Sequence, residues 1–66
     1  QGPAPHQTEQ YLITANIRMD NGYWKWGHVF SVWVEPGPSK GTARDRARQA
    51  AATLYPGCKI ISVAYA

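Results

Sequence analysis

The side chains that could do acid–base or nucleophilic chemistry are few and scattered along this chain. His28 is expected on a core-facing side of a strand, where a lone histidine usually has a structural role. Cys58 follows a Pro-Gly turn and no basic partner that would activate its thiol is evident, so we interpret it as a packing residue. The carboxylates have no spacing that would pair an acid with a base; they are Glu9, Asp20, Glu35 and Asp45. We therefore expect a protein that is not an enzyme and that uses no cofactor and no metal ion.

Basic and aromatic side chains indicate a different kind of chemistry. Seven Lys and Arg against four Asp and Glu give a net charge of +3, which suits an anionic partner such as nucleic acid but also solubility alone. Arg18, Lys25 and Trp33 are expected together on an uncovered face of a sheet. There, ring stacking and phosphate neutralisation would bind nucleic acid. The alternative is that the two cations are only solvated and that Trp33 packs under the first residues of the chain.

The sheet is predicted from a hairpin centred on Asn21-Gly22. Asn-Gly is the strongest short signal for a two-residue type I′ turn, because both central residues of that turn need a positive φ. Strands are expected on either side, from about Gln10 to Met19 and from Tyr23 to about Glu35. The turn pairs Ala15 with His28 in mid-strand. This register is well specified, because a one-residue slip would send the apolar set to the other face.

The register of this hairpin sorts its side chains onto two faces. It pairs Arg18 with Lys25 on the open face, which also carries Trp33. The other face is expected to lie under a helix and receives three aromatic side chains, which are Trp24, Trp26 and Phe30. Gly27 marks the place where a bulge would break this pairing.

A helix is predicted after the loop at residues 36–41. Thr42 with Asp45 three residues later resembles a capping box, so the helix is expected to begin at Thr42. Tyr55-Pro56-Gly57 ends it, because proline cannot continue a helix and glycine suits the turn. The apolar stripe is mostly alanine, which lets the helix approach the sheet closely; it consists of Ala43, Ala47, Ala50, Ala51 and Leu54.

The run from Cys58 to Ala66 is predicted as a third strand, with Ile61, Val63 and Tyr65 on one face and Ile60 on the other. A right-handed crossover places it beside the first strand and antiparallel to it, which gives the strand order 2-1-3. The predicted fold class is therefore α+β. It is a two-layer ββαβ sandwich, in which one helix packs on one face of a three-stranded antiparallel sheet.

Length and composition predict how the chain is organised. Sixty-six residues make one domain, expected at residues 9–66 after a flexible arm over residues 1–8. The opening Gln-Gly-Pro of this arm resembles an expression remnant. One cysteine excludes an intrachain disulfide. The chain has no apolar run long enough for a membrane span and no signal peptide. Together with the single cysteine, these features favour a cytoplasmic protein without a membrane partner. The apolar ending Val-Ala-Tyr-Ala leaves open that the chain is a segment of a larger protein.

A second group of cations surrounds the start of the predicted helix and consists of Lys40, Arg44, Arg46 and Arg48. Cations there oppose the helix dipole, and a helix start attracts anions. The stretch Ser39–Ala47, followed by Ala50-Ala51, resembles the C-terminal signature of double-stranded-RNA-binding domains. This resemblance implies that Lys40 and Arg44 contact phosphates. In the nucleic-acid hypothesis, Lys40, Arg44 and Arg48 would assist the sheet face by contacting the backbone. Solvated helix charge is the alternative.

The order of the elements resembles a different group of proteins. The ββαβ plan, the small size and the Pro-Gly turn into the last strand are similar to small bacteriophage proteins that bind host machinery. Related modules of phage integrases enter a DNA groove with their sheet. Two functions stay open. The first is a nucleic-acid-binding module with the site residues Arg18, Lys25, Trp33, Lys40, Arg44 and Arg48. The second is a phage or mobile-element protein that binds and inhibits a host protein through the same face or an exposed strand edge, as a monomer or as a homodimer through that edge.

Overall fold

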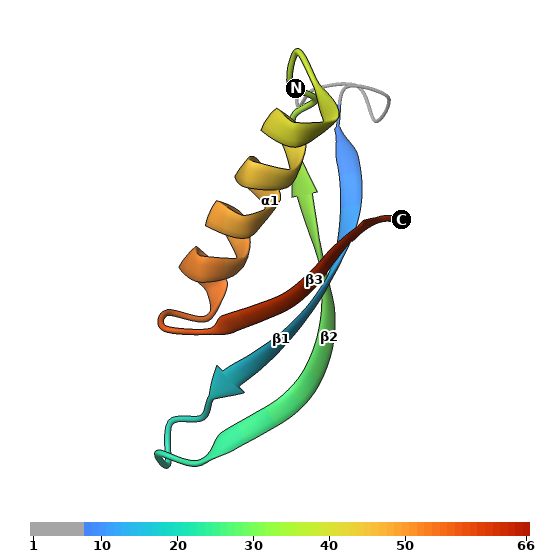
Figure 1. Ribbon diagram of the computed structural model, residues 1–66. Coiled ribbons are helices and arrows are strands. Elements are labelled where there is room, and N and C mark those ends of the chain that lie inside the picture. Colours follow the sequence, from blue (N-terminus) through green and yellow to red (C-terminus); the bar gives the residue numbers. More distant parts are fainter. Residues whose placement is uncertain (1–7) are drawn as a thin grey trace.

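The computed structural model describes residues 8–66, so the predicted arm lies almost entirely outside the described residues. The chain forms β1 (Glu9–Arg18), β2 (Trp24–Val34), α1 (Lys40–Leu54) and β3 (Lys59–Tyr65). The strands are antiparallel in the order β2-β1-β3, and α1 packs on the sheet (Figure 1). The predicted α+β ββαβ fold and its strand order are confirmed. No helix within the described residues is long and apolar enough to cross a membrane.

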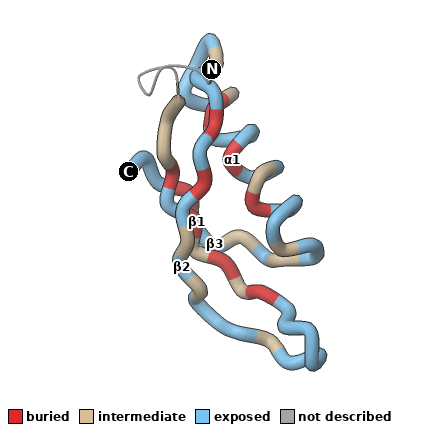
Figure 2. The backbone as a smooth tube through the Cα atoms, turned by 180° about the vertical axis from the view of Figure 1, so that it is seen from behind, coloured by how far each residue is buried: buried red, intermediate tan, exposed pale blue. Residues whose placement is uncertain are grey.

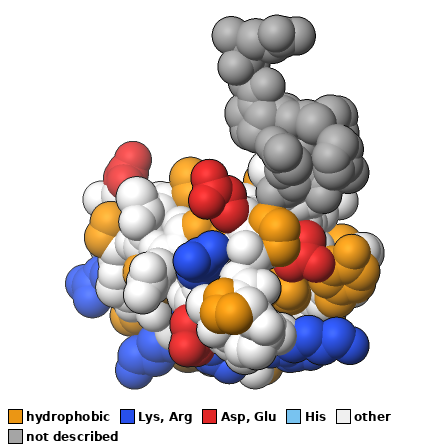
Figure 3. Space-filling view, turned by 90° about the horizontal axis from the view of Figure 1, so that it is seen from above, with side chains coloured by type: hydrophobic (Ala, Val, Ile, Leu, Met, Phe, Trp, Pro, Cys, Tyr) orange, Lys and Arg blue, Asp and Glu red, His pale blue; other side chains and the backbone are white. Residues whose placement is uncertain are grey.

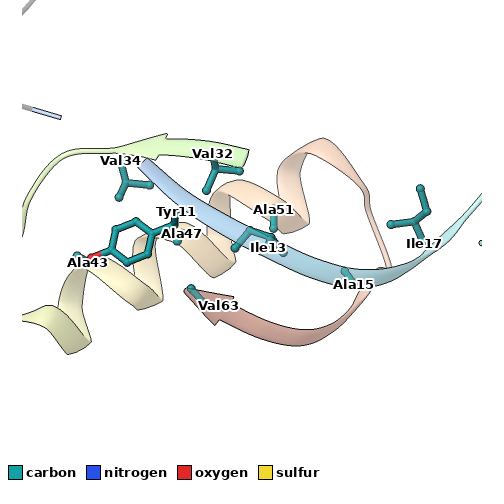
Figure 4. Close-up of a cluster of buried hydrophobic side chains, with 10 residues drawn as sticks. All are labelled: Tyr11, Ile13, Ala15, Ile17, Val32, Val34, Ala43, Ala47, Ala51 and Val63. Atoms are coloured by element: carbon teal, nitrogen blue, oxygen red, sulfur yellow. The ribbon is translucent and has the colours of Figure 1, made fainter. Parts of the chain in front are cut away.

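The hydrophobic core lies between α1 and one face of the sheet. Alternate residues of the central strand β1 are buried, from Tyr11 to Ile17, because successive side chains of a strand point to opposite faces. The helix contributes Ala43, Ala47 and Ala51, each no more than 1% exposed, and their small side chains allow close packing (Figure 4). The predicted alanine stripe is confirmed at these three positions.

Figure 2 shows that burial is concentrated near α1, whereas the turn end of the hairpin is exposed. Leu54, the last residue of the predicted stripe, is 59% exposed. Of the three aromatic residues expected under the helix, only Phe30 packs against the core. The hairpin therefore extends past the part of the sheet that the helix covers.

The helix begins earlier than predicted. Ser39 is the N-cap residue, with extended backbone angles, and its hydroxyl accepts a hydrogen bond from the Thr42 N–H at 3.2 Å. Because Ser39 satisfies this N–H, Lys40 and Gly41 are already helical, and the prediction of a start at Thr42 is wrong. The predicted end is confirmed, since the Tyr55 N–H bonds the Ala51 carbonyl and Gly57 follows with a φ of 80°.

The hairpin loop has three residues, 20–22, instead of two. Met19 and Tyr23 bond across it, and the Gly22 N–H donates to the Met19 carbonyl at 2.9 Å. Gly22 has a φ of 89°, whereas Asn21 does not have the positive φ that a type I′ turn requires. The predicted turn type is therefore wrong, and the pairing next to the loop is offset by one residue.

A bulge at Gly27 removes this offset. Asn16 of β1 lies opposite both Trp26 and Gly27, and its side-chain oxygen accepts a hydrogen bond from the Gly27 N–H at 2.9 Å. Gly27 has a φ of 65°, which glycine adopts at little cost. Beyond the bulge, Ala15 pairs with His28 as predicted, and the predicted register is confirmed from there to the far end of the strands.

Between the loop and the bulge the predicted pairing is wrong. Arg18 pairs with Trp24, and Ile17 pairs with Lys25. The predicted pair of Arg18 with Lys25 does not form, because the extra loop residue shifts β2 by one position. Each β2 side chain in this segment consequently lies on the face opposite to the predicted one.

Strand β3 also departs from simple alternation. Its register with β1 shifts between Ser62 and Ile60, which leaves Ile61 as the extra residue. Ile61 is 60% exposed, whereas Ile60 packs against the core on the helix side. The prediction that Ile61 shares a face with Val63 assumed an uninterrupted alternation of side chains, which this bulge breaks.

Candidate functional site

The sheet face opposite α1 carries a row of large exposed apolar side chains. The even-numbered residues of β1 and their β2 partners lie on this face, because the odd-numbered residues of β1 fill the core. We call the apolar set the aromatic sheet face and define it as Leu12, Trp24, Trp26, Val29 and Trp33. Trp26 is 73% exposed and Trp33 is 62% exposed. Large exposed apolar side chains that gather on one face are typical of interaction sites.

Two of these tryptophans lie side by side next to the bulge. The ring centroids of Trp24 and Trp26 are 6.3 Å apart, and the ring planes differ by 22°. Trp24 reaches this face because it pairs with Arg18, and Trp26 shares the face two residues further along β2. The sequence had predicted both rings under the helix, and the three-residue loop is the reason for the difference, because its one-residue offset persists up to the bulge at Gly27.

Two cations flank this pair of tryptophans. The guanidinium carbon of Arg18 and the ammonium nitrogen of Lys59 are each 5.8 Å from the centre of the Trp24 ring, within the range of cation–π attraction. Lys59 comes from β3, where it pairs with Asn16. Sequence reasoning missed Lys59 and Trp24 as members of the site. The register between the first and last strands would have indicated Lys59.

The structure separates the six predicted site residues into three places. Arg18 and Trp33 lie on the face opposite α1, toward opposite ends of the hairpin. Lys25 pairs with Ile17 and lines a cleft of about 380 Å³ on the helix side, together with His28 and Tyr55. Lys25 and Arg18 therefore do not pair on the open face, although Arg18 also lines this cleft.

The remaining three predicted residues follow one stripe of α1, at four-residue spacing. Arg44 donates a hydrogen bond from its guanidinium to the Val63 carbonyl at 2.8 Å, which fixes its side chain across β3. Lys40 and Arg44 line a second cleft, and Arg48 is exposed. Seen from the end of the molecule where α1 begins, basic and acidic side chains are interspersed, so this end has no uniformly basic surface (Figure 3).

His28 and Cys58 both pack against neighbouring side chains or backbone on the helix side of the sheet. The Nε2 atom of His28 is 3.2 Å from the Tyr55 hydroxyl, and its ring stacks on Phe30 with a centroid distance of 5.5 Å. Cys58 is half-buried and its Sγ lies 4.0 Å from the Ala51 carbonyl oxygen. In the described part of the chain, no group of three or more His, Cys, Asp or Glu residues is placed to hold a metal ion.

Comparison with known proteins returns no match: no protein-family model, no curated protein and no solved structure matches the chain. The likeness to double-stranded-RNA-binding domains and to phage proteins therefore stays an expectation from the sequence. The function has to be argued from the geometry of the chain's own residues.

Proposed function

We propose that this protein is a non-enzymatic module that binds single-stranded nucleic acid on the aromatic sheet face. The observation that carries the proposal is the exposure of Trp26 and Trp33, at 73% and 62%, on the sheet face that the helix leaves open. Bases of a single strand stack on such rings, since every base has a π-face. A duplex keeps its bases stacked inside, so it would use these rings less well.

The cations beside Trp24 support an anionic ligand. Arg18 and Lys59 come from different strands and both lie 5.8 Å from the Trp24 ring. A phosphate backbone passing this ring would have a cation within reach from either strand, and each neutralised phosphate adds to affinity at low salt. The helix cations and Lys25 lie on the other side of the sheet, so the proposal gives them no primary role on this face.

The test is a titration of the full chain with fluorescently labelled single-stranded oligonucleotides of dT and of rU, at low and at moderate salt. We expect binding that weakens as salt rises, because phosphate contacts release counterions. Trp26→Ala and Trp33→Ala should each weaken binding about tenfold, the loss of one base-stacking partner. Tyr23→Ala is the matched control, because Tyr23 is 75% exposed at the hairpin end and is not part of the aromatic sheet face.

Three results would overturn the proposal. One is an absence of binding to both oligonucleotides at low salt. Another is binding by the two tryptophan variants as tight as that of the parent chain. The last is equal loss in the Tyr23→Ala control, which would mean that the tryptophans have no special role.

A protein partner is the second candidate function, and the outer position of β2 favours it. This strand has 11 residues and, in the part of the chain that the structure describes, it pairs with β1 on one side only, so its outer edge can add to another sheet. The partner would be a host protein or a second copy of the chain. Salt-insensitive self-association in analytical ultracentrifugation, together with no oligonucleotide binding, would favour this function over the first.

A further inference from the structure

A cleft on the helix side of the sheet is separate from the aromatic sheet face. It has a volume of about 320 Å³ and is lined by Glu9, Tyr11, Lys40, Arg44 and Tyr65. This is within the lower range of clefts that hold small ligands. The residues come from β1, β3 and the first two turns of α1, so three elements fix their positions.

Tyr11 brings an unpartnered hydroxyl to this cleft. The residue is 2% exposed, and its ring reaches under the start of α1 toward Ala43 (Figure 4). The rings of Tyr11 and Tyr65 form a T-shaped pair with a centroid distance of 5.5 Å. Within the described residues, no hydrogen bond joins this hydroxyl to another group. None of their fully buried side-chain oxygens lacks a hydrogen-bond partner, so the Tyr11 oxygen is not fully buried. The hydroxyl is therefore open to the cleft. Buried tyrosine hydroxyls normally have a hydrogen-bond partner, so this one is free for a ligand.

Lys40 and Arg44 make the cleft suitable for an anion. They lie one turn apart near the N-terminus of α1, where the helix dipole also favours negative charge. Arg44 is held by its hydrogen bond to the Val63 carbonyl. A guanidinium has five N–H donors, so most of them stay available. An arginine held by a hydrogen bond beside a lysine is an arrangement that suits a phosphate group.

Glu9 and Tyr65 narrow the choice of ligand. The Glu9 carboxylate would repel a bare anion, but it accepts hydrogen bonds from hydroxyl groups such as those of a sugar. Tyr65 is 63% exposed and offers a ring for a planar group to stack on. A phosphate, a sugar and a base are the three parts of a nucleotide.

We propose that this cleft binds a nucleoside monophosphate, with the phosphate between Lys40, Arg44 and the Tyr11 hydroxyl. The nucleotide would be a free mononucleotide or the phosphorylated end of a strand, since the chemistry is shared. The inference does not depend on the proposed function of the sheet, because the two sites have no residue in common.

The test is calorimetric titration of the full chain at constant ionic strength with uridine monophosphate, inorganic phosphate and uridine. We expect the monophosphate to bind more tightly than inorganic phosphate, and uridine to bind at least tenfold more weakly. Tyr11→Phe and Lys40→Ala should each weaken binding of the monophosphate about tenfold, the loss of one charge-assisted contact. Arg48→Ala is the control, because Arg48 lies on the same helix stripe but does not line the cleft.

Equal binding of uridine and its monophosphate, or no loss in Tyr11→Phe and Lys40→Ala, would overturn this proposal. Thermal unfolding checks that both variants fold. If Tyr11→Phe does not fold, Lys40→Ala alone tests the proposal. The source follows from oligonucleotides with a 5′-phosphate or a 5′-hydroxyl. If the parent chain prefers the 5′-phosphorylated oligonucleotide and Lys40→Ala loses this preference, the ligand is a strand end. If the parent chain binds both oligonucleotides equally well, the ligand is the free nucleotide. Trp26→Ala should leave binding of the monophosphate unchanged, which separates this site from the aromatic sheet face.

Discussion

Trp24 and Trp26 are neighbours with different surroundings. Trp24 is half-buried, with Trp26, Arg18 and Lys59 against its ring, whereas Trp26 is 73% exposed. Arg18 and Lys59 already contact the Trp24 ring, so this ring is better suited to hold the two cations in place than to stack on a base. Trp26 and the distant Trp33 are the rings free for stacking, and this is why the two alanine variants above are made at these positions.

Tyr11 makes stability depend on pH in the alkaline range. Burial raises the pKa of Tyr11 above its ordinary value of 10.0, Glu9 acts in the same direction, and Arg44 lowers it. The unfolded chain therefore loses this proton first, so the stabilisation is complete below about pH 10 and is lost as pH rises through the folded pKa. Urea unfolding should show the parent chain losing stability more steeply than Tyr11→Phe above this pH.

At neutral pH, Tyr11→Phe should change the free energy of unfolding by less than about 1 kcal/mol, because no protein hydrogen bond is lost. Parallel stability curves for the two proteins between neutral and strongly alkaline pH would contradict the assignment of a raised pKa to Tyr11.

The hairpin contains two irregularities that compensate each other. The three-residue loop shifts the pairing by one position, and the extra residue of β2 at Gly27 restores it. Between them, a short segment carries Lys25 on the helix side and Trp24 on the open side. The composition of the aromatic sheet face therefore depends on the bulge, not on the turn alone.

Gly27→Ala should lower the free energy of unfolding by about 1–2 kcal/mol, because an L-residue is strained at positive φ. Steric crowding would not contribute, since a Cβ at Gly27 meets no atom within 4 Å. Gly41→Ala is the matched control. It lies in the helix, where a Cβ meets nothing closer than Ser39 Oγ at 3.8 Å, and it should be neutral or stabilising by up to about 1 kcal/mol. Urea unfolding measures both, and equal effects of the two substitutions would show that Gly27 does not need a positive φ.

Local patterns were enough to predict the elements and their order. The alanine spacing indicated the helix face, Pro56-Gly57 indicated its end, and Asn21-Gly22 indicated that the chain reverses there. The turn type was wrong, yet the register of the far half was right because the bulge cancels the error. What local patterns could not provide was the hydrogen bond from the Gly27 N–H to Asn16, which joins residues eleven positions apart. In the same way, the position of Lys59 beside Trp24 depends on the pairing of β3 with β1.

The whole molecule is a thin two-layer structure with different chemistry on its two sides. Within residues 8–66, the core has ten buried hydrophobic residues, and those of β1 lie on the helix side of the sheet. Two clefts also lie on that side, at opposite ends of the helix. Among residues 8–66, the other side consists of strand surface, and the aromatic sheet face runs along the hairpin. A ligand on that side would therefore leave the clefts accessible.

Affinity for single strands should depend on length in a stepwise manner. Trp26 lies opposite Asn16 and Trp33 opposite Gln10, six positions apart along β1, which corresponds to roughly 20 Å at about 3.3 Å per residue. A stacked strand rises about 3.4 Å per nucleotide, so roughly seven nucleotides are needed to reach both rings. Titration with dT oligonucleotides of four to twelve nucleotides should show a rise near this length.

Trp33→Ala is the control for this length series. It should remove the step and leave only the gradual increase that comes from the larger number of positions on a longer oligonucleotide. A parent chain that binds four and twelve nucleotides equally well would contradict simultaneous contact with both rings.

The arrangement of the tryptophans gives the sheet face two unlike ends. One end has Trp24 and Trp26 with Arg18 and Lys59, and the other has Trp33 next to Gln10 of β1. A nucleic-acid strand also differs between its two ends. A strand lying along this face would therefore adopt one preferred 5′-to-3′ polarity, and a bulge of one residue would be the origin of that directionality.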